Sequence, residues 1–355
     1  MKYNRPLDGL RGIAILLVFA FHLGLLPFGW IGVQLFFVLS GFLITNILIE
    51  MRSLPIVDYY KRFYWRRTLR IFPLYYSFLF GAAAIYIIWG IPAGFNHDWP
   101  FLFSFTHNLA RLQETDVNVL VHFWSLGVEE QFYLIWPTVV IFLSIKGLKK
   151  TVIILIITVP FFRWGVGLVA MGPDTLDPKY YARVVYSLPI SHFDAFATGA
   201  LISLFEFSWI RNRRLVFVLG LFFMLAIGCL QVVAMHLQGG VNWPHFGYPH
   251  FLPSNLQFVW GYTIINFVAG LAILCCRDKN AIGKWIENRF LVYIGRISYG
   301  IYIFHFPIIL AARELTQLVS FSVPATLTVI FAVVVTFVVS AVSFELFEKQ
   351  FLRLK

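Results

Sequence analysis

Apolar runs of about 20 residues follow one another along nearly the whole chain, and no other feature limits its possible folds so strongly. A helix of that length crosses the hydrocarbon core of a membrane, which is about 30 Å thick. Only 13% of the 355 residues are charged, against about 25% in soluble domains. A backbone in lipid must satisfy its own hydrogen bonds, so the sequence predicts an all-α membrane protein with about ten transmembrane helices. The predicted spans are 12–27, 30–49, 70–91, 122–145, 151–171, 184–207, 215–236, 257–276, 291–312 and 323–344.

The lysines and arginines between these spans are distributed unevenly. If the N-terminus lies in the cytoplasm, 22 of the 28 fall in cytoplasmic segments and only four in outer segments. This asymmetry predicts that both termini are cytoplasmic. The net charge of +11 would otherwise suggest a nucleic-acid partner, but charges at the ends of spans indicate membrane orientation instead. No internal repeat or soluble stretch is visible, so we expect one domain, residues 1–355, passing many times through the cytoplasmic membrane.

Two ionisable residues lie eleven positions apart at the first predicted span: Arg11 comes directly before it and His22 lies within it. Eleven helical steps of about 100° bring both side chains to one face, about 16 Å apart along the axis. With Arg11 at the membrane edge, His22 would lie near the middle of the hydrocarbon layer, where an ionisable residue indicates a functional site. Two alternatives stay open: His22 hydrogen-bonds a neighbouring helix, or Arg11 only anchors the helix to lipid headgroups.

A polar stripe runs through the segment HFWSLGVEEQFYLIWP at 122–137. Its members recur at helical spacing: His122, Ser125, Glu129 and Tyr133. Two adjacent carboxylates inside a span are costly unless they are paired or line an aqueous cavity. We interpret Glu129 as a site residue that orients a histidine or binds a polar acceptor, whereas Glu130 points about 100° away. A structural ion pair is the alternative.

Arg67 and Arg70 belong to a basic, aromatic run, DYYKRFYWRRTLRIFPLYY, at residues 58–76. Being three residues apart, they share one face of a helix. Planar guanidinium groups suit bidentate binding of phosphate, and this segment is expected to face the cytoplasm, where nucleotide-type cofactors are available. Ordinary positive-inside anchoring explains the same charges equally well.

Other polar side chains inside the predicted spans need partners. Asp194 lies in the span 184–207 and requires a cation or a hydrogen-bond donor. In the segment GRISYGIYIFH at 295–305, Tyr302 and His305 lie on a polar side of the ninth span. His305 is either a second site histidine or a hydrogen-bonded packing residue.

Two predicted outer loops, 92–121 and 237–256, are long and rich in polar or aromatic residues. Such loops bind sugars by stacking, or they anchor a protein at the membrane interface. His245 and His250 in the second loop have no carboxylate nearby, and the three cysteines lack metal-like spacing. The sequence therefore predicts no metal site.

Taken together, these segments resemble the acyltransferase-3 family of polytopic enzymes, which O-acylate cell-surface glycans and some small molecules. The resemblance rests on LDGLRG with Arg11 and His22, GVQLFFVLSGFLI at 32–44, RRTLR at 66–70, HFWSLGVEEQFYL at 122–134 and SYGIYIFH at 298–305. It implies that His22 is the catalytic histidine and that Arg11 belongs to the same motif. It also implies that Arg67 and Arg70 bind the acyl-CoA donor, and that Glu129 and Glu130 match the family segment WSLxVEEQFY.

The chain departs from the family pattern at three positions. Gln34 stands where aspartate or another acidic or polar residue is common, His192 stands where arginine is expected, and Gln350 stands where proline is usual. We expect these differences to leave the core chemistry intact and to affect acceptor specificity. The esterase-like SGNH domain fused to some members is expected to be absent, because the sequence ends eleven residues after the last predicted span.

The resulting hypothesis is a membrane O-acyltransferase. A neutral His22 imidazole would take the proton of an attacking hydroxyl. The expected donor is cytoplasmic acyl-CoA, chiefly acetyl-CoA, and the expected acceptor is a hydroxyl of a cell-surface or lipid-linked saccharide, with no metal and no nucleic acid. The candidate residues are His22, Glu129 and Arg11 for catalysis, Arg67 and Arg70 for the donor, and Glu130, Tyr302, His305 and Asp194 for the acceptor.

Two other classes of protein remain as alternatives. A transporter or permease for a polar or anionic small molecule also places ionisable residues at mid-membrane, but it predicts an internal repeat. A sensor or scaffold would use the aromatic outer loops and would not need His22.

Overall fold

The protein is described here from a computed structural model. The structure describes residues 4–89, 95–113, 120–170, 178–239, 245–277, 286–317 and 324–355. Within these ranges every regular element is a helix and no strand occurs, as the apolar runs predict. The chain forms two compact units. Unit 1 comprises Met1–Met51 and Ser125–Gly295, and unit 2 comprises Arg52–Trp124 and Arg296–Lys355.

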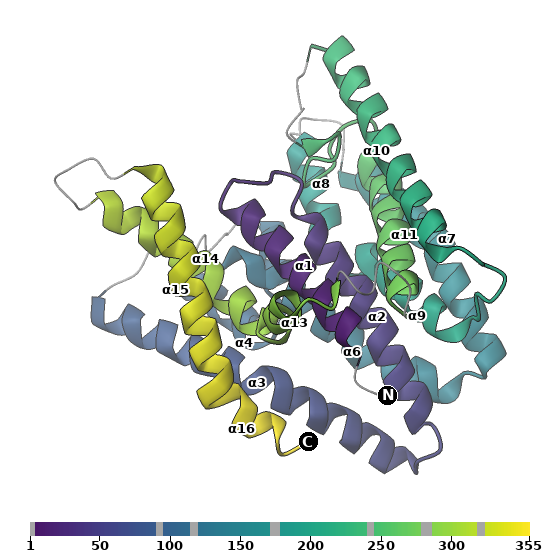
Figure 1. Cartoon of the computed structure of the whole chain (residues 1–355), viewed down its shortest axis with the longest axis horizontal. Coiled ribbons are helices and arrows are strands. Elements are labelled where there is room, and N and C mark those ends of the chain that lie inside the picture. The colour runs from purple at the N-terminus through teal and green to yellow at the C-terminus, as the bar shows by residue number, and fades with distance from the viewer. Residues whose placement is uncertain are drawn as a thin grey trace. The chain divides into compact units, whose positions relative to one another are not determined.

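Unit 1 is a bundle that combines long apolar helices with shorter ones (Figure 1). Its elements are α1 (Arg5–His22), α2 (Ile31–Met51), α6 (Trp124–Phe142), α7 (Ile145–Ala170), α8 (Pro178–Ser187), the 3-10 turn η3 (Pro189–His192), α9 (Phe193–Leu204), α10 (Arg213–Leu237), α11 (Gln257–Arg277) and α13 (Arg289–Arg296). α2 and α9 pack closely together, and α7 and α11 pack against α9. α1 covers α2, and α10 lies along α11.

Glycines allow α2 and α9 to cross at short range. A Cβ atom on Gly41 of α2 would overlap the backbone of Phe196, and a Cβ atom on Gly199 of α9 would overlap the carbonyl oxygen of Val38. Helix association in lipid depends on close van der Waals packing, which small residues at a crossing permit. The α2–α9 crossing is therefore a point where unit 1 tolerates no added side chain.

Replacing Gly199 by alanine is expected to destabilise unit 1, because its methyl group overlaps backbone that cannot rotate away. Overpacking of this kind costs about 1–3 kcal/mol, so the unfolding midpoint of the purified protein in detergent should fall. The control is Gly165→Ala on α7, where no atom lies within 4 Å of the added Cβ. That variant should be as stable as the wild type or more stable, since alanine favours helix. Equal unfolding midpoints for Gly199→Ala and Gly165→Ala would contradict the close crossing of α2 and α9.

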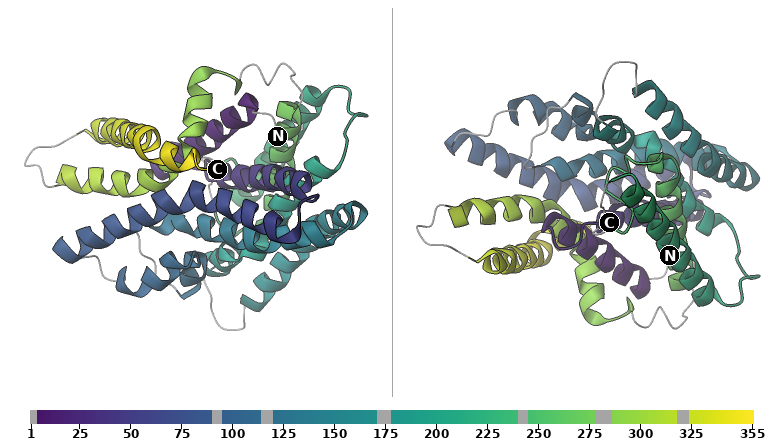
Figure 2. Two further views of the ribbon diagram at one scale, coloured as in Figure 1. Left: turned by 90° about the horizontal axis from the view of Figure 1, so that it is seen from below. Right: turned by 90° about the horizontal axis from the view of Figure 1, so that it is seen from above.

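Unit 2 contains one very long helix, α3, and the C-terminal helices. Its elements are α3 (Ile56–Trp89), α4 (Phe95–Phe103), α5 (His107–Ala110), the 3-10 turns η1 (Arg111–Gln113) and η2 (Val121–Phe123), α14 (Ser298–Gln317), α15 (Ala325–Ser343), the π-helical turn η5 (Phe344–Glu348) and α16 (Lys349–Leu352). α14 and α15 lie side by side, as both views of Figure 2 show. α16 contacts α3, where the Trp65 indole donates to the carbonyl oxygen of Leu354 at 3.3 Å.

The described part of the predicted outer loop 92–121 is folded onto α3. The Tyr75 hydroxyl donates to the carbonyl oxygen of Leu102 at 2.7 Å, and the Phe105 ring stacks on Tyr75 with 4.2 Å between centroids. This segment is thus packed structure within unit 2 and not only a connection.

Six helical segments of the described residues are long and apolar enough to cross a membrane, or seven if α13 and α14 are counted as one broken span. The six are Ile31–Met51, Ile56–Ile88, Ile145–Ala170, Arg213–Leu237, Gln257–Arg277 and Ala325–Leu352. They agree with the predicted class, an all-helical protein with several membrane spans. The count of ten spans and the cytoplasmic termini stay predictions.

Two expected helices end or break earlier than the sequence suggested. α1 stops at His22 and not at residue 27, because Gly24 adopts a positive φ of 79° that a helix does not contain. The expected continuous span 184–207 is divided between α8 and α9, since Pro189 has no amide hydrogen to continue the helix. With 12 residues, α9 is about 18 Å long, shorter than the hydrocarbon core.

Candidate active site

The carboxylate of Glu129 on α6 is held by two hydroxyl groups. Ser40 of α2 and Tyr133, one turn further along α6, both donate hydrogen bonds to Oε1. Two donors on one oxygen fix the orientation of the half-buried side chain. The polar stripe predicted Tyr133 beside Glu129, whereas Ser40 comes from another helix and was not a candidate.

Arg11 and His22 lie on the single helix α1, as their spacing predicts. The guanidinium of Arg11 lies 3.8 Å from the Asp8 carboxylate one turn earlier. His22 is the last residue of α1, and its half-buried ring packs edge-on against Phe21 with 5.2 Å between centroids. The structure therefore places the imidazole at the C-terminus of α1, and its depth in the membrane stays a prediction.

Arg163 of α7 and Asp194 of α9 form a completely buried ion pair, with 2.9 Å between Nη2 and Oδ2. Thr263 also donates to Oδ2, at 2.9 Å, and Nη1 of Arg163 donates to the carbonyl oxygen of Ser191 at 2.7 Å. This is the partner that Asp194 required. Arg163 was not among the candidate site residues, although a lone arginine in one apolar run and a lone aspartate in another indicate a buried pair. A substrate-binding role for Asp194 stays a prediction.

Two departures from the family pattern, Gln34 and His192, contact each other. Nε2 of Gln34 lies 3.0 Å from Nδ1 of His192, and Nε2 of His192 lies 2.8 Å from the carbonyl oxygen of Tyr186. A carbonyl only accepts, so Nε2 of the histidine carries the proton and Nδ1 accepts from the Gln34 amide. Both side chains are completely buried. A neutral hydrogen bond thus joins the position where aspartate or another acidic or polar residue is common in the family to the position where arginine is expected.

Combining Gln34→Asp with His192→Arg tests whether the two departures compensate each other. His192→Arg alone buries a cation opposite an amide, and Gln34→Asp alone replaces that amide by a carboxylate, so each single variant should be less stable than the wild type. The double variant should recover part of the loss, with a coupling energy of about 0.5–3 kcal/mol. The free energy of unfolding of the three variants is measured in detergent. If the effects of the two single substitutions simply add in the double variant, Gln34 and His192 do not compensate each other.

In unit 2, Tyr302 and His305 of α14 meet His122 of η2. The buried His305 has Nδ1 at 2.9 and 2.8 Å from the carbonyl oxygens of Ile301 and Tyr302, so Nδ1 carries a proton and donates. The centroids of the His305 and His122 rings lie 5.0 Å apart. The Tyr302 hydroxyl donates to the carbonyl oxygen of His122. His122 belonged to the predicted polar stripe but was not among the candidate site residues.

Arg67 and Arg70 lie one turn apart on α3 of unit 2, as their spacing predicts. Glu348, the last residue of the π-helical turn η5, is 7% exposed and interacts electrostatically with Arg70. Ser343 donates to its carboxylate at 3.2 Å. Short π-helical turns often occur at functional sites. Glu348 was not among the candidate residues, because no local sequence pattern distinguishes it from the exposed charges of the C-terminal segment.

The candidate residues therefore fall into two groups, one in each unit. Unit 1 holds Arg11, His22, Glu129, Glu130 and Asp194, and unit 2 holds Arg67, Arg70, Tyr302 and His305. In the part of the chain that the structure describes, no group of three or more His, Cys, Asp or Glu side chains is arranged to hold a metal ion.

Fold and site together define a multi-pass helical membrane protein with imidazole, guanidinium and carboxylate groups inside its helical units. Residues 4–345 match a family model described as an acyltransferase domain, that of the acyltransferase-3 family. The chain belongs to this family.

Curated relatives carry consistent names. The chain is 29% identical over 376 residues to the peptidoglycan O-acetyltransferase OatA of Listeria monocytogenes, covering 98% of this chain and 55% of that protein. It is 27% identical over 371 residues to YrhL of Bacillus subtilis, described as a candidate peptidoglycan O-acetyltransferase, with the same two coverages. The chain thus spans about half the length of the curated relatives it matches. No solved structure matches it significantly.

Proposed function

We propose that the chain is a membrane O-acyltransferase that moves an acyl group, chiefly acetyl, from cytoplasmic acyl-CoA to a hydroxyl of a cell-surface or lipid-linked saccharide. Family membership supports acyl transfer, and the name of OatA supports a saccharide acceptor. The observation that carries the proposal is the Glu129 carboxylate, which accepts hydrogen bonds from the Ser40 and Tyr133 hydroxyls. An acceptor hydroxyl has the same chemistry as the two groups that this carboxylate already binds.

In the proposed step, the oxygen of the acceptor hydroxyl attacks the thioester carbonyl carbon of acyl-CoA. The neutral imidazole of His22 takes the hydroxyl proton while the C–O bond forms and the C–S bond breaks, and the proton then passes to the CoA thiolate. Glu129 orients the imidazole or the acceptor. Arg11 belongs to the same family motif as His22 and is proposed to take part in catalysis with it. In the alternative route, an imidazole nitrogen of His22 attacks the thioester carbonyl carbon and CoA leaves as the thiolate. The acceptor hydroxyl then attacks the acyl-imidazole, the bond to His22 breaks, and the hydroxyl proton passes to the thiolate.

The remaining candidates bind the two substrates. Arg67 and Arg70 are proposed to hold the phosphates of the donor, because planar guanidinium groups bind phosphate in a bidentate manner. The acceptor is proposed to contact Glu130, Asp194, Tyr302 and His305. Ten spans with cytoplasmic termini, in the cytoplasmic membrane, would place the N-terminal half of α3 on the side where acyl-CoA is made. The reaction needs no metal.

An assay of acetyl transfer across the membrane of vesicles, with the protein in a single orientation, tests this proposal. The purified protein is reconstituted in one orientation, with labelled acetyl-CoA on one side and a soluble peptidoglycan oligosaccharide on the other. Label should reach the saccharide only when acetyl-CoA is on the side of the termini. Uptake of saccharide without any acyl transfer would support the transporter alternative, and transfer from either side would contradict the assigned orientation.

A further inference from the structure

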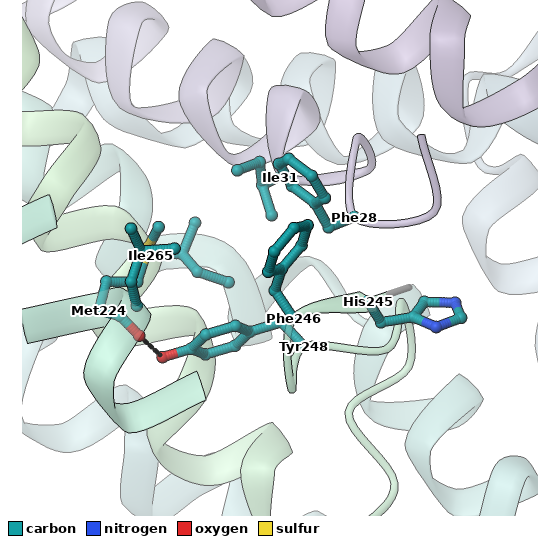
Figure 3. A pocket seen from close by; sticks show the side chains of 8 residues that line it. Phe28, Ile31, Met224, His245, Phe246, Tyr248 and Ile265 are labelled. Carbon is teal, nitrogen blue, oxygen red and sulfur yellow. Dashed lines mark hydrogen bonds between the residues drawn. The ribbon is translucent and has the colours of Figure 1, made fainter. Parts of the chain in front are cut away.

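The segment from His245 to Leu256, which we call the aromatic loop, leads into α11 and is packed firmly into unit 1. The buried Trp30 donates from its indole to the carbonyl oxygen of Tyr248 at 3.0 Å. The Tyr248 hydroxyl donates in turn to the carbonyl oxygen of Met224 on α10 at 2.9 Å, as Figure 3 shows. A loop that only rested in the membrane interface would not need these buried bonds.

The backbone of the aromatic loop is held in an unusual conformation. Among the described residues, five that are not glycine have a positive φ, and four of them lie here: Phe246, Leu252, Asn255 and Leu256, with φ between 47° and 52°. Such conformations persist only where the surrounding structure imposes them, and they concentrate at ligand-binding and active sites. The clustering indicates a loop whose shape is specified for a purpose beyond connecting two helices.

The aromatic loop reaches the end of α1 that carries His22. The His250 ring lies 5.7 Å from Phe21, and Phe21 lies 5.2 Å from His22, measured between ring centroids. Phe246 meets Phe28 just beyond α1, at 5.0 Å. One phenyl ring therefore separates His250 from the proposed catalytic imidazole. His250, Phe21 and His22 are all partly exposed, and the His250 ring also packs against Phe251, with 4.0 Å between centroids.

The cavity behind the aromatic loop does not itself offer room for a sugar. It measures about 80 Å³ and is lined mainly by apolar side chains, among them Phe28, Ile31, Met224 and Phe246. For comparison, an engineered apolar cavity of about 150 Å³ binds one benzene molecule. In Figure 3 the His245 ring points away from the cavity. A saccharide would therefore bind on the face of the loop that carries His250.

We propose that the aromatic loop is the saccharide-facing wall of the acceptor site, with the ring of His250 against one face of a sugar and the Phe21 ring, tilted by 55° to it, at the edge of that sugar. This inference rests on the proposed function and assigns residues to its acceptor. Sugar rings combine apolar C–H faces with a rim of hydroxyl groups, which suits an aromatic surface whose imidazole nitrogens both donate and accept hydrogen bonds. A preformed wall also lowers the ordering cost of binding.

The test measures the kinetics of acetyl transfer to a soluble peptidoglycan oligosaccharide. His250→Ala is expected to raise the KM for the saccharide about tenfold, the loss of one good contact, with kcat and the KM for acetyl-CoA within about twofold of wild type. His250→Phe keeps the flat ring and should lie between alanine and wild type. The matched control is His236→Ala, an exposed histidine at the end of α10, which should change nothing.

Direct binding separates failure of this inference from failure of the proposed function. Calorimetry with the same oligosaccharide on the purified protein should show about tenfold weaker binding for His250→Ala, whether or not the wild type transfers acetyl groups. If the wild type is active and both His250 variants bind the saccharide with unchanged affinity, the proposed contact between the aromatic loop and the saccharide is wrong. The proposal that the protein is an acyltransferase is then unaffected. Absence of transfer by a wild type that still binds saccharide through His250 would overturn only the proposed reaction. Thermal unfolding checks that each variant is folded, and His250→Gln replaces any that is not.

Discussion

Replacing His22 by alanine is expected to lower the rate of acyl transfer by about 10²–10⁴-fold, the usual contribution of a general base. The family resemblance assigns catalysis to this histidine, and its partly exposed position at the end of α1 leaves the ring accessible to substrates. Because the ring is only half-buried, its removal should change the unfolding midpoint little. The measurement is transfer of labelled acetyl groups in reconstituted vesicles, at saturating donor and acceptor.

His236→Ala is again the matched control, since it removes an exposed imidazole from another helix end. Equal transfer by wild type and His22→Ala would end the catalytic assignment. Mass spectrometry of the wild type incubated with acetyl-CoA alone distinguishes the two chemical routes. An acetylated His22 would indicate the acyl-imidazole route, and its absence in an active preparation would indicate direct transfer.

Replacing Arg163 by methionine should have the largest effect on stability. The variant leaves the Asp194 carboxylate without its buried cation, and removing one partner of such a pair costs about 3–5 kcal/mol. The unfolding midpoint in detergent should fall markedly, and the yield of folded protein should fall with it. Arg214→Met, an exposed arginine in the first turn of α10, should stay within about 0.5 kcal/mol of wild type.

The double variant Arg163→Met with Asp194→Leu completes this experiment. Apolar replacement of both members removes the unpaired charge, so most of the lost stability should return. A double variant no more stable than Arg163→Met would show that the pair is not an isolated structural unit. If the rescued protein is folded but has a raised KM for the saccharide, the prediction that Asp194 binds the acceptor is supported, and an unchanged KM rejects it.

Features with a local physical cause were accessible from the sequence. Long apolar runs dictate helices in lipid, so the all-helical membrane class followed from composition and run length alone. The hydrogen bond between Tyr133 and Glu129 follows from spacing, because residues four apart share a helical face. The placement of Arg11 and His22 on one helix, and of Arg67 and Arg70 on another, has the same origin. The combination of motifs was sufficient to suggest the family.

What only the tertiary structure decided is which distant residues meet. Ser40 binds Glu129 across 89 positions, Gln34 binds His192 across 158, and Arg163 finds Asp194 across 31. Helical periodicity specifies which face a side chain occupies, but not which other helix covers that face. That choice depends on packing, such as the overlap that only glycine avoids at Gly41 and Gly199. A buried polar group must have a hydrogen-bond or ion-pair partner. The sequence therefore indicated that such a partner exists, and the packing of the helices determined which residue it is.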